Sequence, residues 1–356
     1  MRVLCVVGEN ISHDLTDNLR PSKRRRTAGR TVELLDLMKP DGELTAEDRH
    51  QMDRLLAVLQ SKKKIVAVVG AGISVSAGVP SFGSPTGLFR NIEKEYNIKG
   101  PRAFLFDASV YKHHETTQSF HAMVRQLFAI TQKVKPTPFH RLLAALARDK
   151  RLLRLYSQNI DCIDTSMQPL ATQIPLKAKG PWPATIQLHG SLGKMFCTKC
   201  DCLEPFDPKL FEESGVPLCR SCEAADNART TRDGKRSHGV GRLRPRIVLY
   251  NEESPDVEAI GKVSAADLKT CPDAVLVVGT ALKIPGTRRL VQEMCKATRK
   301  RENGITIWIN TQSAPKSAGL RDCWDIVVKA DCDKIAHMAD FLDYDASVDD
   351  DHVSSE

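Results

Sequence analysis

Short apolar runs alternate with helical patterns along most of the chain. Met or Leu stands at positions 52, 55, 56 and 59, the spacing of an amphipathic helix, and Thr45 with Asp48 is placed to cap its start. The run 65–69 follows and has the β-branched composition of a buried strand. Similar runs lie at 152–156, 185–188, 247–250, 274–278, 305–309 and 326–328.

Helical patterns separate several of these runs. Residues 137–147 begin with a capping Thr and a Pro at the first helical position, and residues 286–301 and 332–342 also have helical patterns. Buried strands that alternate with helices are typical of a parallel sheet covered on both faces. The sequence therefore predicts an α/β fold with a doubly wound parallel sheet.

Residues 195–245 interrupt this alternation. They are rich in Cys, then polar and basic, and they show no pattern of a buried strand. We therefore expect a small module inserted into a larger domain. The expected parts are a basic, weakly structured extension (1–43), the α/β domain (44–194 and 246–342), the inserted module (195–245) and an acidic tail (343–356).

The composition is that of a globular protein. Of the 356 residues, 41% are hydrophobic and 27% are charged, which excludes collagen-like, coiled-coil and wholly disordered chains. The first apolar stretch is too short for a signal peptide, and no run reaches the roughly 18 apolar residues of a membrane-spanning helix. We therefore expect the 11 Cys to be thiols or metal ligands rather than disulfides.

Positive charge is unevenly distributed. The net charge is +8, and because the tail 343–356 carries six acids and no Lys or Arg, the rest of the chain carries +14. Basic residues gather at 23–26 and at 228–246. These clusters suit either an acidic partner such as nucleic acid or chromatin, or a solvated surface, and the first also fits a nuclear-import signal.

A glycine-rich turn, GAGISVSAG (70–78), follows the run 65–69. Glycines here let the backbone approach a pyrophosphate, and the N–H groups at the start of a following helix favour an anion. Val75 departs from the G-x-G-x-x-G spacing. Taken alone, the turn fits either a dinucleotide site or a tight connection between strand and helix.

Two C-x-x-C pairs with 18 residues between them match a four-thiolate zinc ribbon. Four protein ligands leave no open position on the metal, so we expect a structural role. Cys202 is a spare thiol that we expect to be a bystander. The four expected ligands are Cys197, Cys200, Cys219 and Cys222.

Polar residues follow four other predicted strands, at the edge where open α/β sheets bind ligands. His189 has the titration range of a general base. Each motif taken singly is also explained by a capping loop or a structural histidine. The residues at these strand ends are Gln158, Asn159, Asp161, His189, Gly279, Thr280 and Asn310.

In this order the motifs resemble those of the sirtuins, the NAD-dependent protein deacylases of the silent information regulator family. The resemblance spans roughly residues 45–342. The sequence YNE, where most sirtuins have FGE, is similar to a fungal branch that acts on histones. The segments concerned are GAGISVSAGVPSF (70–82), QNID (158–161), HG (189–190), both C-x-x-C pairs, RPRIVLYNE (244–252), GTAL (279–282), IN (309–310) and DCD (331–333).

The resemblance implies a Rossmann-like domain and a small zinc domain, with NAD and acetyl-lysine meeting in a cleft. It implies that His189 is the general base on a ribose hydroxyl and that Asn159 assists it. Val248, Leu249 and Tyr250 would pair with the substrate backbone. The implied cofactor-binding residues are Gly70, Ala71, Gly72, Ser74, Phe82, Gln158, Asn159, Asp161, Gly279, Thr280, Asn310 and Cys332.

One departure from the family pattern concerns the cofactor loop. Ser81 and Gly83 stand where the family has Asp and Arg. Losing one charge-assisted contact costs about 1.5–3 kcal/mol, so an alternative is a catalytically impaired, sirtuin-like chromatin scaffold. A third reading is a zinc-ribbon protein that binds nucleic acid, with the other motifs incidental.

The leading hypothesis is a nuclear NAD-dependent deacetylase of acetylated histones that serves chromatin silencing. It would transfer the acetyl group to ADP-ribose and release nicotinamide. The implied partners are acetylated histones or other acetyl-lysine proteins and chromatin, with no membrane. Direct contact with nucleic acid through the basic segments is also an expectation.

Overall fold

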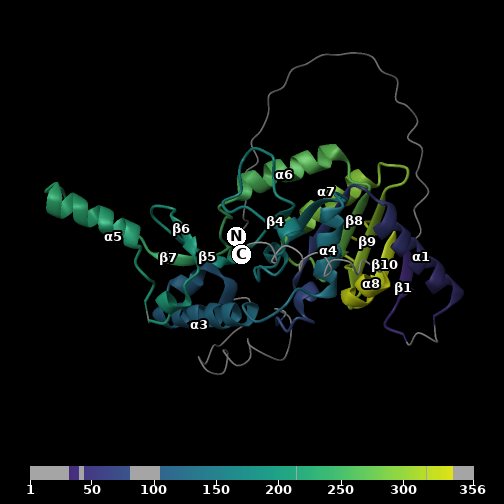
Figure 1. Ribbon diagram of the computed structural model, residues 1–356, viewed down its shortest axis with the longest axis horizontal. Helices are drawn as coiled ribbons and strands as arrows, with labels where there is room; N and C mark the ends of the chain where they lie inside the picture. Colours follow the sequence, from purple (N-terminus) through teal and green to yellow (C-terminus); the bar gives the residue numbers. More distant parts are fainter. Residues whose placement is uncertain (1–31, 40–43, 81–104, 214, 318, 340–356) are drawn as a thin grey trace, which may run out of the picture. The chain divides into compact units, whose positions relative to one another are not determined.

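The computed structural model describes residues 32–39, 44–80, 105–213, 215–317 and 319–339. Its largest feature is a seven-stranded sheet in which every neighbouring pair is parallel (Figure 1). The predicted fold class is therefore confirmed. Across the sheet the strands are β1 (Glu33–Asp36), β10 (Ile326–Lys329), β9 (Ile305–Asn310), β8 (Ala274–Val278), β2 (Ile65–Val69), β3 (Leu152–Ser157) and β4 (Thr185–Gln187).

Helices cover both faces of this sheet. In β2 the side chains of Ile65, Ala67 and Val69 join one apolar core, whereas Val66 and Val68 join another. A buried parallel strand thus needs apolar residues at every position, which is why these strands appear as unbroken runs. The first core includes α1 (Ala46–Ser61), α4 (Pro138–Arg148) and α8 (Cys332–Met338); the second includes α6 (Val257–Thr270) and α7 (Pro285–Thr298).

The helix starts follow local sequence rules. The side chain of Thr45 accepts a hydrogen bond from Asp48 N at 3.1 Å, and the Asp48 carboxylate accepts one from Thr45 N at 3.0 Å. This reciprocal pair caps α1, as the sequence predicted. Thr137 caps α4 in the same way, with Pro138 in the first turn.

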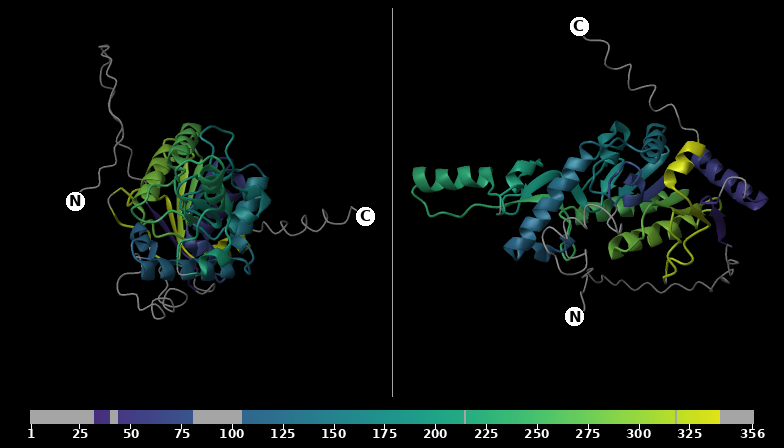
Figure 2. Two further views of the ribbon diagram at one scale, coloured as in Figure 1. Left: turned by 90° about the vertical axis from the view of Figure 1, so that its left-hand side faces the viewer. Right: turned by 90° about the horizontal axis from the view of Figure 1, so that it is seen from below.

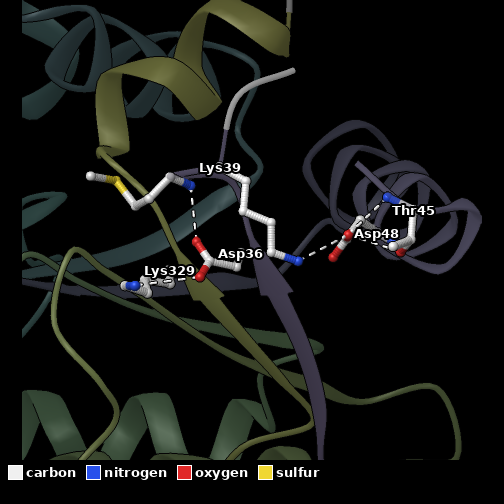
Figure 3. A network of polar contacts seen from close by, with 6 residues as sticks. Asp36, Lys39, Thr45, Asp48 and Lys329 are labelled. Atoms are coloured by element: carbon white, nitrogen blue, oxygen red, sulfur yellow. Dashed lines mark hydrogen bonds and ion pairs between the residues drawn. The ribbon is translucent and has the colours of Figure 1, made fainter. Parts of the chain in front are cut away.

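The strand β1 lies inside the segment 1–43, which we predicted to be weakly structured, so that prediction was wrong for residues 33–36. Lys329 of the neighbouring β10 forms an ion pair with Asp36 at 3.3 Å, and Lys39 reaches Asp48 of α1 at 3.5 Å (Figure 3). Leu35 is fully buried. Glu33, at the other end of β1, forms an ion pair with Arg54 of α1. Charged contacts at both ends and the buried Leu35 and Leu37 attach this edge strand, so its sequence contains no long apolar run.

A second, antiparallel sheet contains β6 (Leu203–Pro205), β5 (Gly190–Cys197) and β7 (Leu243–Ile247). Two expectations were wrong here: residues 195–245 do contain buried strands, and the strand expected at 247–250 ends at Ile247. The sequence of β7, LRPRI, lacks the apolar pattern of a strand because it carries two arginines. Arg246 is buried and paired with Asp256, and Arg244 is half-buried and paired with Glu252. Its proline is tolerated because β7 pairs with β5 alone.

The small module draws on two stretches of the chain. Phe120 and Met123 of α3 (His114–Thr131) share an apolar core with Met195 of β5 and with Phe206 and Phe211. Residues 105–131 therefore pack with the cysteine-rich segment, although the sequence analysis assigned them to the larger domain. The helix α5 (Arg220–Asn227) begins at the second C-x-x-C pair.

Candidate active site

The topology places a ligand-binding edge at β2. From β2 the chain continues to β3 and β4 on one side of the sheet. It then crosses to the other side of β2, where β8, β9 and β10 follow in order, so the direction of strand order reverses at β2. In open α/β sheets such a reversal opens a crevice outside the carboxyl ends of the strands. Every strand-end residue singled out from the sequence follows β2, β3, β4, β8 or β9, so all of them lie at this one edge.

The glycine-rich turn after β2 packs directly on the turn after β8. Gly72 N donates to Gly279 O at 2.8 Å, and Gly70 N donates to Val278 O at 3.0 Å. A Cβ on Gly72 would lie 2.5 Å from Gly279 Cα, and Gly279 itself has a φ of +62°. Only glycine fits at Gly72 and Gly279, because backbone meets backbone there.

The polar residues after β3 bind back to this turn. Ser74 Oγ donates to Asp161 Oδ2 at 2.7 Å, and Asn159 Nδ2 lies 3.3 Å from Ser74 Oγ. Gln158 Nε2 donates to Thr280 Oγ1 at 2.9 Å. Asn159 and Asp161 are buried, so the three turns form one polar network across β3, β2 and β8.

His189 lies at the end of β4, half-buried, with its ring fixed by one hydrogen bond. Its Nδ1 lies 3.0 Å from the carbonyl oxygen of Gln158, which can only accept, so Nδ1 carries the proton and Nε2 keeps its lone pair. Burial lowers the pKa of His189, and the Gln158 carbonyl partly offsets that shift. The ring is therefore neutral near pH 7, which is the form that accepts a proton.

The other residues that the resemblance implies for cofactor binding lie on the other side of β2. Asn310 Nδ2 donates to Thr280 O at 2.8 Å, so the ends of β9 and β8 are joined. The Cys332 thiol, at the start of α8, lies 3.9 Å from Gly72 O. Thus Gly279, Thr280, Asn310 and Cys332 surround the glycine turn.

Two further acids at this edge were missed by sequence reasoning. Asp164 is fully buried, and its Oδ2 has no hydrogen-bond partner among the described residues. Burial and the charge of nearby Asp161 raise the pKa of Asp164 to about 7. Asp333 accepts from Phe139 N at 2.9 Å and from Ser76 Oγ, which ties α8 to α4 and to the turn after β2. Asp333 belongs to the motif DCD (331–333), which the resemblance includes without giving this residue a role, and Asp164 lies three residues after QNID (158–161).

The substrate strand implied by the resemblance is already partly paired. Val248 N donates to His189 O at 3.0 Å, and Tyr250 N donates to Phe106 O at 2.6 Å. Tyr250 O in turn accepts from Ala108 N at 3.0 Å. The backbone of residues 248–250 therefore connects His189 to the small module, and its role toward substrate stays a proposal.

The two C-x-x-C pairs converge. All four sulfur atoms lie within 4.8 Å of one another, with Cys197–Cys222 and Cys200–Cys219 separations of 3.7 Å. A tetrahedral site with Zn–S bonds of about 2.3 Å has S···S edges of about 3.8 Å, so the thiols fit a zinc ion. Gly241 is needed here, because a Cβ on it would lie 2.3 Å from Cys197 Sγ.

Cys202 lies beside this cluster, with its sulfur atom 3.5 Å from Cys219 Sγ. It is not one of the four mutually close ligand atoms. Phe82, Ser81 and Gly83, on which the cofactor loop and the impaired alternative depend, lie outside the described residues.

The fold and the strand-end network define a nucleotide-binding α/β protein with a structural tetrathiolate module. The chain belongs to the Sir2 family, whose model matches residues 70–285. That match includes both the glycine turn and the thiolates, so the reading that treats the glycine and strand-end motifs as incidental is wrong.

Relatives with curated names extend the match over most of the chain. The NAD-dependent protein deacetylase hst4 of Emericella nidulans is 48% identical over 334 residues, which is 92% of this chain and 56% of the relative. The NAD-dependent histone deacetylase HST4 of Saccharomyces cerevisiae is 38% identical over 90% of this chain and 88% of its own length. This chain thus spans just over half of the Emericella relative.

Solved structures agree on the fold. A Sir2 homolog–NAD complex superposes with a TM-score of 0.58 at 19% identity, covering 81% of this chain and 93% of that one. The structure of Sir2Tm bound to a propionylated peptide gives a TM-score of 0.58 at 20% identity, with coverage of 81% and 96%. At this identity the likeness concerns the fold alone.

Proposed function

We propose that this protein is an NAD-dependent protein-lysine deacetylase that acts on acetylated histones. The observation that carries the proposal is the strand-end network, in which His189, Asn159, Asp161 and the glycine turn meet at the topological switch point. Membership of the Sir2 family and relatives named as NAD-dependent deacetylases support it.

The residues at the switch point fit NAD chemically. The glycine turn after β2 presents backbone to a pyrophosphate, while Gln158, Asn159 and Asp161 supply amide and carboxylate groups for the nicotinamide ribose and carboxamide. Gly279, Thr280, Asn310 and Cys332 would contact the adenosine half. Bound NAD supplies the ribose carbon that receives the acetyl oxygen as nicotinamide leaves.

His189 is the proposed base in this reaction. Its neutral ring, with Nδ1 bound to Gln158 O, leaves Nε2 available to take a proton from a ribose hydroxyl. Val248, Leu249 and Tyr250 hold the substrate backbone in this proposal. Zinc bound by Cys197, Cys200, Cys219 and Cys222 has a structural role, because the four thiolates fill its coordination sphere.

A chromatin setting in the nucleus is part of the proposal. Two Saccharomyces cerevisiae relatives are named histone deacetylases, and the basic clusters at 23–26 and 228–246 suit import and an acidic partner. No helix in the part of the chain that the structure describes has the length and apolarity to cross a membrane.

Replacing the proposed base tests the function. We expect His189→Ala to lower the rate of deacetylation of an acetylated histone peptide by 10²-fold or more, as expected when a general base is lost. The matched control is His50→Ala, an exposed histidine of α1. Equal rates for the two variants would contradict the assignment of His189.

A further inference from the structure

The segment 220–242 forms an arm on the small module. Figure 1 and the right-hand view of Figure 2 both show α5 extending away from the β5–β7 sheet before the chain returns to β7. Cys222, a zinc ligand, is the only buried residue of α5, and the π-helical turn 228–232 buries none. A helix exposed nearly all round is not explained by packing on a core.

Polar contacts hold the returning chain against this helix. Asp226 accepts hydrogen bonds from Ser237 Oγ at 2.6 Å and from His238 N at 2.7 Å. Lys199 Nζ, from the first C-x-x-C turn, donates to the carbonyl oxygens of His238 and Gly239 at 2.7 and 2.6 Å. The arm is thus a defined structure tied to the zinc cluster, rather than a loose surface loop.

A further contact fixes the basic tip. Arg229 Nε donates to Arg236 O at 2.8 Å, which closes the helix end on the return segment. Within 220–242 there are six Lys or Arg residues against three Asp or Glu, an excess of three positive charges. The three cations at the tip with the most exposed positions are Arg232, Lys235 and Arg236.

These cations are available to a ligand. The side chain of Arg232 is 84% exposed and that of Lys235 59% exposed. Both face Asp233, at 3.4 and 3.7 Å, but ion pairs this exposed contribute little to stability and exchange readily for another anion.

The composition of the arm indicates which kind of acidic partner it would bind. Residues 220–242 contain no Phe, Tyr or Trp, so the arm lacks the large aromatic side chains on which unpaired bases stack. A duplex presents one negative charge per about 1.7 Å along its axis, so spaced cations meet phosphates in any register. Arginine also matches phosphate oxygens with two parallel hydrogen bonds.

We propose that the arm 220–242 binds the phosphate backbone of duplex nucleic acid without regard to sequence, through Arg232, Lys235 and Arg236. This inference rests on the proposed function for its setting, since it would hold the enzyme on chromatin. The contacts themselves need neither NAD nor an acetyl group.

The test uses the full chain and a fluorescent 25-base-pair DNA duplex, with binding measured by anisotropy over a salt series. The arm variant carries Arg232→Gln, Lys235→Gln and Arg236→Gln. The control variant carries Lys262→Gln, Lys269→Gln and Lys296→Gln, which removes the same charge from exposed positions of α6 and α7. All proteins retain the basic cluster at 23–26, so any difference belongs to the arm.

We expect the arm variant to bind the duplex at least 10-fold more weakly, with a log–log salt slope shallower by about 2.7, while the control changes little. Equal losses in both variants would overturn the proposal, because net charge alone would explain them. Unchanged duplex binding with weakened binding to polyglutamate would overturn it in favour of an acidic protein partner.

Two further measurements keep the outcomes distinct. The melting temperature and zinc content of the arm variant should equal those of the parent, because none of the three side chains is buried. Deacetylation of a free acetylated peptide should also be unchanged. If the parent protein does not deacetylate the peptide, the proposed function is contradicted. The DNA-binding measurements still test the role of the arm in that case.

Discussion

At the scale of single residues, Gly72 and Gly279 cannot be replaced, because backbone atoms of the facing turn leave no room for a side chain. We expect Gly72→Ala and Gly279→Ala to destabilise the protein and to abolish NAD binding, because a Cβ would lie 2.5 Å and 2.8 Å from backbone atoms of the facing turn. Gly261→Ala is the matched control: apart from its chain neighbours and the backbone of α6, no atom lies within 4 Å of its Cβ position, so it should stabilise by up to about 1 kcal/mol. Urea denaturation and calorimetric NAD titration measure both effects, and a stable, NAD-binding Gly72→Ala variant would contradict them.

Asp164 makes the stability depend on pH. Its pKa is about 7 in the folded protein, mainly through burial, against about 4 in an unfolded chain. Between about pH 4 and 7 the folded state therefore keeps a proton on Asp164 that the unfolded chain has released. The free energy of unfolding falls as pH rises through this range, and Asp164 causes no further change above about pH 7.

Asp164→Asn removes this titration while it keeps the shape of the protonated acid. We expect the variant's advantage in free energy of unfolding over the parent to grow from pH 5 to pH 7 and then stay constant. Urea denaturation at pH 5, 6, 7 and 8 measures it. A difference that does not vary with pH would show that Asp164 is ionised throughout.

The sequence was sufficient to find most residues at the site but not this acid. Gln158, Asn159 and His189 follow apolar runs, and parallel strands necessarily bring such ends to one edge. The burial of Asp164 instead depends on how the loop after β3 packs under the site. Sequence spacing carries no information about that packing.

At the scale of elements, a buried ion pair joins β3 to α6. Arg154 Nε and Nη2 donate to the two oxygens of Asp267 at 2.9 and 3.0 Å, and Tyr156 Oη donates to Asp267 Oδ2 at 2.6 Å. Asp267→Ala leaves the buried arginine without its counter-ion, with only the carbonyl oxygens of Trp182 and Pro183 as partners, so we expect a loss of about 3–5 kcal/mol in the free energy of unfolding.

An exposed ion pair serves as the control for that loss. Glu258 and Lys262 lie one turn apart on α6 and are exposed, so Glu258→Ala should leave the free energy of unfolding nearly unchanged. Chemical denaturation of both variants makes the comparison. Similar small losses for the two would contradict a tight connection between β3 and α6 through Asp267.

The thiolate cluster holds the small sheet together. We expect one zinc per chain by atomic absorption, and we expect Cys219→Ser to lose the metal and lower the melting temperature, because zinc binding contributes directly to folding. Cys271→Ser, which changes a half-buried thiol outside the cluster, should keep both. Full zinc occupancy in Cys219→Ser would contradict the assignment of Cys219 as a ligand. Cys202, whose sulfur lies beside that of Cys219, would then be the fourth ligand.

Elements of the large sheet could be predicted where both faces are buried. The run at 274–278 is β8 itself, whereas β1 and β7 were missed. An edge strand needs few apolar residues. In β7, of the small sheet, the buried Arg246 and the half-buried Arg244 form ion pairs with residues of the loop at 252–256. A pattern of apolar residues does not reveal a strand whose charged side chains are held in the fold by ion pairs.

At the scale of the whole molecule, one chain carries the strand-end site, the four-thiol module and the basic arm. The impaired alternative depends on Ser81 and Gly83, outside the described residues. If the purified chain is inactive and the double change Ser81→Asp, Gly83→Arg creates activity, that alternative is correct. Activity in the parent excludes it.

The most direct test of the central claim is to follow nicotinamide release by the purified, zinc-loaded chain with NAD and an acetylated histone peptide. We expect one nicotinamide per acetyl group removed, recovery of the acetyl group on ADP-ribose, and no release without the acetylated peptide or with His189→Ala. No nicotinamide release by the folded, zinc-loaded chain from any acetylated histone peptide would contradict it.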